Sequence, residues 1–377
     1  MKHLRTTIAT AILAVGANAA IADIRIGISL PLTGPTSALG IPLKNAIAMW
    51  PTSIGGEKLD VIILDDATDP TQATKNARRF VTDDKVDILM GSAATPPATA
   101  VAVVAAETGT MHITFAPIDV STGKAPWSYN MPQSTLVMSH AIVEHMKKNG
   151  VKTVGFLGYA DAYGELFLRD MKAKMAGTQL KFVSEERFAR TDTSVTGQAL
   201  KVTAGAPDAI LIVASGSGAA MPHKALIERG YKGKIYQTHG AASRDLMRVG
   251  GKDVEGAYVV AGPGMVAEQL PANHPSKKVA MAHVEAWEKI YGPDTRNPFA
   301  AHGYDASILL QKIIPVALKT AKPGTPEFRA ALKSALEHAG PIALFHGTVN
   351  YTATNHAGYT DETGVIMRIT NGNWKLQ

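Results

Sequence analysis

The sequence contains no cysteine. The chain can therefore form no disulfide bond, and no lipid can be attached at a cysteine beside a cleavage site. It also lacks any run of basic residues, and its formal charge is only +6 over 377 residues. A nucleic acid is therefore not expected as a partner, and the small positive excess is weak support for an anionic ligand. Stability must come from burial of an apolar core.

No stretch of the chain reaches the ~18 apolar residues that a membrane-spanning helix needs. The first 22 residues instead have the pattern of an export signal. Lys2 and Arg5 give a positive start, residues 8–15 are apolar, and Ala20 and Ala22 stand where a signal peptidase reads small side chains. We expect a mature protein that begins at Asp23 and diffuses in a periplasm.

The motifs of common enzymes are missing as well. There is no GxSxG, no phosphate-binding loop and no nucleophile–base pair at a recognisable spacing. His140, Glu144 and His145 loosely resemble a zinc-binding helix, but the spacing differs by one residue, so we interpret them as a solvated helix surface. We expect no catalytic residue, no metal site and no cofactor.

Short β-branched runs alternate with amphipathic stretches along the chain. This alternation predicts βαβ units and parallel sheets. Strands are expected at 24–30, 59–64, 86–90, 111–115, 153–157, 180–184, 209–214, 235–237, 257–261, 349–351 and 365–369. Helices are expected at 39–50, 71–83, 95–107, 136–148, 163–175, 219–229, 276–291, 302–320 and 326–338. Two such runs meet near residue 134, which predicts an α/β protein with two doubly wound parallel-sheet lobes.

Five motifs stand in a fixed order along these elements. They are LPLTGP at 30–35, DDATDP at 65–70, Gly91-Ser92, Tyr163-Gly164 and Glu255-Gly256. Together they resemble the type I periplasmic solute-binding proteins of the branched-chain amino acid (Leu/Ile/Val-binding) family. The resemblance covers nearly the whole chain after residue 22.

The resemblance implies two lobes joined by three crossovers, which close on a ligand like a hinged trap. It places the crossovers near residues 131–135, 260–264 and 344–348. Lobe I would then comprise residues 23–134 and 261–345, and lobe II residues 135–260 and 346–377. It also implies a monomer that delivers a small molecule to an inner-membrane ABC permease.

Several site residues follow from the resemblance. Ser92 and Thr95 flank the start of a helix, where they would either cap it or hold a ligand carboxylate, and we favour the carboxylate. Ala116 falls where the family grips the ligand with backbone atoms. Ile118 replaces a threonine that usually grips the carboxylate, which puts an amino-acid pose in doubt.

On the second lobe, Tyr163 would either pack at the rim or lie against the ligand, and we favour contact. His239 stands where relatives that bind amino acids carry an acidic residue. A histidine supplies no fixed negative charge, although it can donate to a carboxylate or a phenol. An ordinary loop histidine is the alternative interpretation.

The remaining candidates shape the cavity. Residues 215–220 are all small where amino-acid binders often carry a large aromatic, so Ser215 and Ser217 would offer hydroxyls beside extra room for a ring. Leu39 would form an apolar wall, and Phe115 would stack on a ring or belong to the core. His302 and Tyr304 are weaker candidates near the cleft.

These features predict a periplasmic receptor for an ABC importer that binds a small organic acid, with an aromatic carboxylate favoured. A branched-chain amino acid or amide remains the alternative within the class. A periplasmic hydrolase and a sensor of the same fold are the alternatives from other classes.

Overall fold

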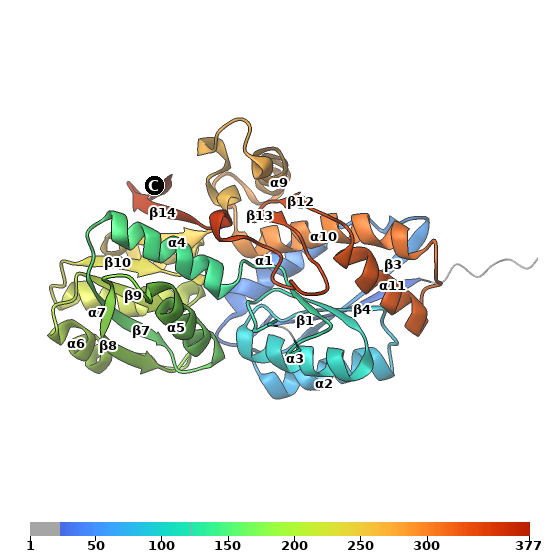
Figure 1. The fold of residues 1–377 in the computed structure, drawn as a ribbon, viewed down its shortest axis with the longest axis horizontal. Coiled ribbons are helices and arrows are strands. Elements are labelled where there is room, and N and C mark those ends of the chain that lie inside the picture. Colours follow the sequence, from blue (N-terminus) through green and yellow to red (C-terminus); the bar gives the residue numbers. More distant parts are fainter. Residues whose placement is uncertain (1–22, 122) are drawn as a thin grey trace, which may run out of the picture.

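The computed structural model describes residues 23–121 and 123–377, and the predicted signal segment lies outside this part of the chain. Two α/β lobes lie side by side (Figure 1). The first lobe holds a six-stranded sheet in the order β2-β3-β1-β4-β5-β6, parallel except for the short β2–β3 hairpin. Its strands are β1 (Ile24–Leu30), β2 (Ser53–Ile54), β3 (Glu57–Asp65), β4 (Ile88–Gly91), β5 (Met111–Thr114) and β6 (Ser128–Asn130).

Helices cover both faces of this sheet, because its strands are apolar on both sides. In β4, Ile88 and Met90 join the cluster with α1, α10 and α11, whereas Leu89 joins the cluster with α2 and α3. This is the alternation that a strand backbone imposes. The helices are α1 (Ser37–Ile47), α2 (Pro70–Thr82), α3 (Thr95–Thr108), α10 (Pro298–Ala317) and α11 (Pro326–Glu337).

The second lobe holds a seven-stranded mixed sheet in the order β15-β14-β11-β10-β9-β7-β8. Strands β7 to β11 are parallel, and β14 and β15 add an antiparallel edge. The strands are β7 (Thr153–Tyr159), β8 (Lys181–Phe188), β9 (Ala209–Val213), β10 (Lys234–Gln237), β11 (Tyr258–Ala261), β14 (Val365–Thr370) and β15 (Asn373–Leu376). The helices are α4 (Thr135–Lys148), α5 (Ala162–Met175), α6 (Thr196–Ala204), α7 (Ala220–Glu228) and α8 (Arg244–Gly250).

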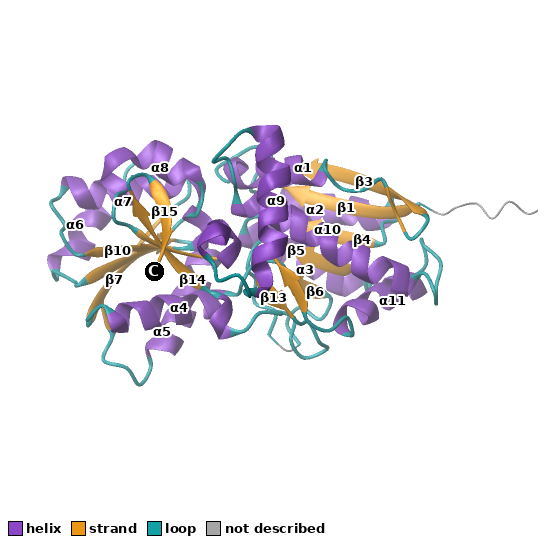
Figure 2. Ribbon diagram, turned by 90° about the horizontal axis from the view of Figure 1, so that it is seen from above, coloured by secondary structure: helices purple, strands orange, loops and turns teal. Residues whose placement is uncertain are grey.

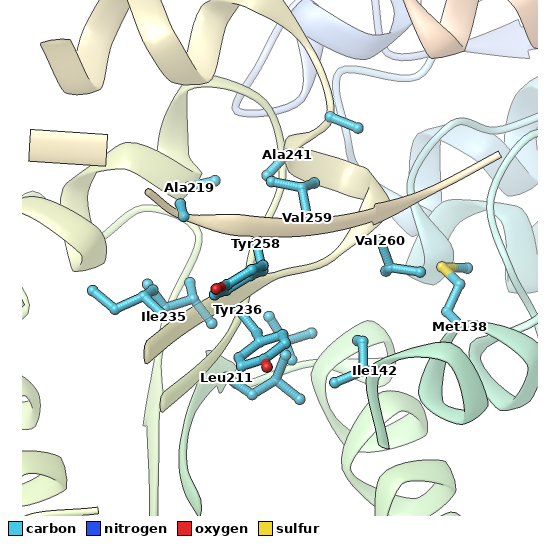
Figure 3. Packing of buried hydrophobic residues seen from close by; sticks show 14 of the residues in the cluster. Met138, Ile142, Leu211, Ala219, Ile235, Tyr236, Ala241, Tyr258, Val259 and Val260 are labelled. Carbon is cyan, nitrogen blue, oxygen red and sulfur yellow. The ribbon is translucent and has the colours of Figure 1, made fainter. Parts of the chain in front are cut away.

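The core of the second lobe is aromatic and aliphatic (Figure 3). Tyr236 of β10 stacks on Tyr258 of β11, with ring centroids 5.0 Å apart. The Tyr236 hydroxyl reaches Nδ1 of His145 at 2.9 Å, so this buried polar group is paired. His145 therefore packs against the sheet of its own lobe.

The chain passes between the lobes three times. It crosses after β6, after β11 and again between the small β12–β13 hairpin (Ile342–Leu344, Gly347–Val349) and β14. Helix α9 (Pro275–Tyr291) lies over the junction (Figure 2). Its Ala280 and Val284 belong to the second lobe's core, while Trp287 packs on Ala46 and Ala300 of the first lobe. No helix within the described residues combines the length and apolar character needed to cross a bilayer.

The predicted two-lobed α/β fold is confirmed, and β1 has the predicted limits. The sequence patterns did not reveal α6, α8, β2, β6, β12 or β15, which are short or polar. The last crossover also lies later than the expected return at residue 346. Val349, Tyr351 and Tyr359 pack in the core of the first lobe, and the Tyr351 hydroxyl donates to the Asn130 carbonyl at 2.6 Å.

Candidate ligand-binding site

A cavity lies between the lobes, with about 260 Å³ of space not filled by protein atoms. Residues from both lobes line it. The first lobe contributes Leu39, Ala93, Ala94, Thr95, Ala116, Pro117 and Phe299. The second lobe contributes Tyr163, Arg190, Ser215, His239 and Gly240.

Strand ends explain this location. Apart from Phe299 at the start of α10, the lining segments follow β1, β4 and β5 in the first lobe and β7, β8, β9 and β10 in the second. Parallel strands release their loops at the same sheet edge, and in each lobe this edge faces the other lobe. The cavity therefore sits where two sets of carboxyl-end loops meet.

The wall from the first lobe is small and apolar. Thr95 opens α3, but its hydroxyl donates to the Pro117 carbonyl at 2.9 Å. Pro96 and Pro97 follow, and a proline has no backbone N–H. A helix normally begins with four backbone N–H groups that have no partner within the helix, and two of these are missing at the start of α3. This helix end therefore offers an anion fewer hydrogen bonds than the predicted carboxylate site requires.

Ala116 also lines this wall. Its backbone N–H donates to the Thr114 hydroxyl at 3.1 Å, and its carbonyl accepts from the same hydroxyl at 2.7 Å. The loop after β5 is thus held in place by its own strand. The backbone groups that the family resemblance assigned to ligand binding already have a partner within the loop.

Arg190 supplies the one fixed charge among the lining residues. It follows β8, and its side chain is 12% exposed. Nε donates to Asp161 Oδ2 at 2.6 Å, and Nη1 donates to the Ser215 hydroxyl at 3.1 Å. The guanidinium carbon also lies 4.1 Å from the centre of the Tyr159 ring. Packing on a ring and pairing with a carboxylate together fix the orientation of the guanidinium.

This arrangement leaves donors free. Within the described chain, neither Nη2 hydrogen of Arg190 has an acceptor. An arginine fork with unused donors at a cavity is suited to a carboxylate, which it can bind through two parallel hydrogen bonds. Asp161, its counter-charge, also caps α5 through the backbone N–H groups of Tyr163 and Gly164.

Tyr163 and His239 form the adjacent part of the wall. The Tyr163 hydroxyl donates to the Thr238 hydroxyl at 2.8 Å, and burial raises the Tyr163 pKa well above its usual value. His239 is 7% exposed, and its ring centre lies 6.4 Å from that of Tyr163. Burial, reinforced by His346, lowers the His239 pKa to about 3, so this imidazole is neutral near pH 7.

Six of the nine predicted residues line the cavity, namely Leu39, Thr95, Ala116, Tyr163, Ser215 and His239. Ser92, Phe115 and Ser217 do not. Ser92 is fully buried, and its hydroxyl approaches Asp66 without reaching hydrogen-bond geometry. Phe115 belongs to the core of the first lobe, and Ser217 is exposed.

Three further residues lie outside the cavity wall. Ile118 pairs its backbone N–H and carbonyl with the Asn130 side chain. His302 is buried behind His239 and stacks on His346, with ring centroids 3.9 Å apart. Tyr304 is half-buried against His283. His302 and Tyr304 thus sit near the cleft without lining it.

Arg190 and Phe299 line the cavity although the sequence patterns did not predict either residue. The predicted strand at 180–184 stopped too early, because the charged run Glu185–Arg187 reads as solvent-exposed. In the structure β8 is an edge strand that continues to Phe188, and edge strands tolerate charge. Arg190 therefore stands at a strand's carboxyl end, the position from which the other site residues were predicted. Phe299 opens α10, whose start was placed too late.

Contacts across the cleft show that the two lobes are closed on each other. Arg169 of α5 donates from Nη1 to Asp119 of the first lobe at 2.9 Å, and Asp119 also pairs with Lys124 at 2.7 Å. On another side, the Gly216 backbone packs against Leu39 and Ala38 of α1. No cluster of three or more metal-ligating side chains occurs in the part of the chain described here.

Comparison with known proteins agrees with this architecture. A solved extracellular ligand-binding receptor from Rhodopseudomonas palustris HaA2 is 48% identical, covers 94% of this chain and 99% of its own, and superposes with a TM-score of 0.92. A Leu/Ile/Val-binding protein homologue (homolog 3) of Brucella melitensis is 23% identical over 90% of this chain and 89% of its own. An R. palustris ABC transporter solute-binding protein in complex with benzoate is 19% identical over 94% and 95% of the two chains, with a TM-score of 0.79, so it supports the fold alone.

The model of the family described as periplasmic binding protein matches residues 23–373. The match spans both lobes and all the segments that line the cavity. The chain therefore belongs to the periplasmic binding protein family, together with the Leu/Ile/Val-binding protein homologues.

Proposed function

We propose that this protein is the substrate-binding component of an ABC importer and that it captures an aromatic carboxylate between its lobes. One observation carries the proposal. The twelve residues that line the cavity include one arginine and one neutral histidine but no aspartate or glutamate. The cavity thus offers a partner for an anion and none for an ammonium group.

An α-amino acid is poorly served by this lining. Its ammonium group would leave water for a closed cavity, where an unpaired ion costs several kcal/mol. Asp161 is the nearest described carboxylate to Arg190, but it is already bound by that arginine and does not line the cavity. An acid without an amino group avoids this cost.

The rest of the lining suits a ring. Leu39, Phe299 and Tyr163 present apolar or aromatic surface, and three alanines leave room between them. The cavity is small in this closed arrangement, and its facing apolar surfaces favour a ligand built on a single flat ring over a bulkier one.

A branched-chain amino acid is the second candidate ligand, because the Brucella melitensis relative is named as a Leu/Ile/Val-binding protein homologue. Calorimetric titration of the purified protein with benzoate, 3-phenylpropanoate and leucine separates the two. We expect at least one aromatic acid to bind near micromolar strength, about −8 kcal/mol, and leucine to bind at least ~10-fold more weakly. Tight leucine binding without acid binding would refute the ligand assignment, and turnover of the corresponding esters would favour a hydrolase.

A further inference from the structure

Three buried histidines form a row across the junction of the two lobes. His239 follows β10 in the second lobe, and its ring centre lies 6.4 Å from that of His302, near the start of α10 in the first lobe. His302 in turn stacks on His346, with ring centroids 3.9 Å apart. His346 lies in the turn between β12 and β13, and the Gly262 backbone of the second crossover packs against it. The row therefore connects the second lobe to the first and to a crossover.

The burial of His239 depends on contact with the first lobe. The side chains of Phe299 and His302, both in α10, have ring centres 6.3 Å and 6.4 Å from that of His239. His239 Nδ1 and both ring nitrogens of His302 are shielded from solvent and have no hydrogen-bond partner within the described chain. Separation of the lobes would remove α10 from His239 and expose the imidazole to water.

The titratable groups beside His239 do not stabilise a protonated ring. Tyr163 of α5 keeps its proton, because burial raises the Tyr163 pKa well above its usual value. Burial, with His346 and His239 nearby, lowers the pKa of His302 well below its usual value. A proton on His239 would therefore be surrounded by a neutral phenol and a neutral imidazole.

The charged groups nearby are paired with each other. Asp305 Oδ2 lies 2.8 Å from Nδ1 of His346, and its other carboxylate oxygen accepts from a backbone N–H at 2.8 Å. Arg190 lines the same cavity as His239 and repels a second positive charge, while Asp161 is held by Arg190 at 2.6 Å. Neither carboxylate is free to balance a charge on His239.

These surroundings make the contact between the lobes sensitive to pH. Burial, reinforced by His346, lowers the His239 pKa to about 3, whereas an imidazole in water titrates near ~6.5. The lowered pKa belongs to the closed arrangement. Closure is therefore fully favoured above pH ~6.5 and is opposed progressively as the pH falls below that value, because the open form then gains a proton.

We propose that closure of the lobes expels a proton from His239, so that acidification opens the cleft and releases the ligand. Histidines at an interface are suited to such a switch, because a change of one charge alters the balance between two arrangements. The inference rests on one part of the proposed function, the closing of two lobes on a ligand, and it holds for any ligand that closes them.

Calorimetric titration at pH 7.5 and 5.5 tests the coupling. The titrants are benzoate, 3-phenylpropanoate and leucine, and their carboxylates remain ionised at both values because carboxyl groups titrate near pH ~4. We expect the wild type to bind its ligand about 10-fold more weakly at pH 5.5, where an exposed imidazole is protonated about 10:1. His239→Gln should reduce the difference between the two pH values to ~2-fold or less, since glutamine does not titrate.

Proton release provides a second measurement on the wild type, which needs no variant. Titrations at pH 6 in buffers of low and high ionisation enthalpy should show that binding releases ~0.7 of a proton, and almost none at pH 8. His239→Gln should abolish this release. If that variant does not fold, the wild-type release decides, and a value near zero at pH 6 would contradict the coupling.

His223→Gln is the matched control. Burial lowers the His223 pKa to about 4, but His223 lies in α7 and packs near Gln237 and Asp253 of its own lobe. Its burial does not depend on the first lobe. This variant should therefore keep the wild-type difference in affinity between pH 7.5 and 5.5.

Two results would overturn the inference. One is equal affinity of the wild type at both pH values, and the other is an undiminished pH dependence in His239→Gln. Failure of all three titrants to bind at pH 7.5 would instead refute the proposed ligands. Solution scattering of the ligand-free protein then decides, because its radius of gyration should grow between pH 7.5 and 5.5 in the wild type and not in His239→Gln. An unchanged wild-type radius would overturn the inference.

Discussion

Replacement of Arg190 by methionine provides the sharpest test of the site. Methionine keeps much of the length of the side chain and removes its charge. A hydrogen bond to a charged group contributes about 1.5–3 kcal/mol, and the free side of the guanidinium can donate two to a carboxylate. We therefore expect Arg190→Met to weaken binding of an aromatic acid by at least ~3 kcal/mol, or more than ~100-fold.

Asp161 adds to this loss. In the variant its carboxylate loses the Nε donor at 2.6 Å and remains beside the bound acid, so two negative charges face each other. Asparagine can cap a helix nearly as well as aspartate, so Asp161→Asn should preserve the start of α5. The double variant Arg190→Met/Asp161→Asn should therefore recover part of the lost affinity. Recovery would identify repulsion as one component of the loss.

The assay is calorimetric titration with each acid and with its neutral amide. The amide lacks the charge that Arg190 would bind, so its affinity should change by less than ~5-fold in Arg190→Met. Thermal unfolding without ligand checks that the variant is folded. An equal loss for acid and amide, or a loss below ~5-fold for the acid, would refute the assignment of Arg190 as the carboxylate partner.

Three further predictions concern stability and closure. Burial raises the Asp66 pKa from 3.8 to about 6, so folded Asp66 keeps a proton that the unfolded chain releases, and stability should fall by up to ~3 kcal/mol between pH 4 and 6. Urea unfolding across this range should show that Asp66→Asn lacks that component, and identical pH slopes would contradict the reasoning. Asp119→Asn removes the negative charge that pairs with Arg169 across the cleft. Because the pair is exposed, ligand affinity should fall only ~2–5-fold, and this loss should be smaller at high salt. Gly216→Ala places a methyl group 3.1 Å from Leu39 of the facing lobe, at a residue with positive φ. The strained backbone should lower the stability of the ligand-free protein by ~1–2 kcal/mol, and the close contact should weaken ligand binding by ~5-fold. Unchanged affinity would show that the lobes close without this contact.

Much of the fold followed from local patterns. In the run at 24–30 apolar residues alternate with Arg25, Gly27 and Ser29, and this alternation predicts a strand with one apolar face. The structure confirms the strand, and in β1 every residue except Arg25 is buried. Short or charged elements were not predicted, because a few residues, or residues that are mostly charged, show no clear hydrophobic periodicity. Strand β8 shows the reason, since its half-exposed glutamates are stabilised by edge pairing with β7 and not by burial.

The candidate site was predictable to the extent that it depends on strand ends. Tyr163, Ser215 and His239 follow or precede recognisable elements, and a sheet's carboxyl edge brings such loops together. Ser92 and Phe115 lie beside the cavity residues Ala93 and Ala116 on first-lobe loops, yet their side chains are buried inside the first lobe. Neighbouring residues in a loop differ in orientation, and no periodicity predicts which of them faces a cavity.

The sequence by itself determined the two α/β lobes, the order of their strands along the chain and the absence of disulfide bonds. Hydrophobic periodicity and the absence of cysteine are properties of the chain, and they need no knowledge of distant contacts. Only the tertiary structure decided that Arg190 meets Asp161 and Ser215, and that His239 is neutral with an unpaired nitrogen. Charge pairing and burial depend on residues that are far apart in sequence. The pairing of Arg190 arises when the second lobe folds, and the burial of His239 arises when Phe299 of the first lobe packs near it.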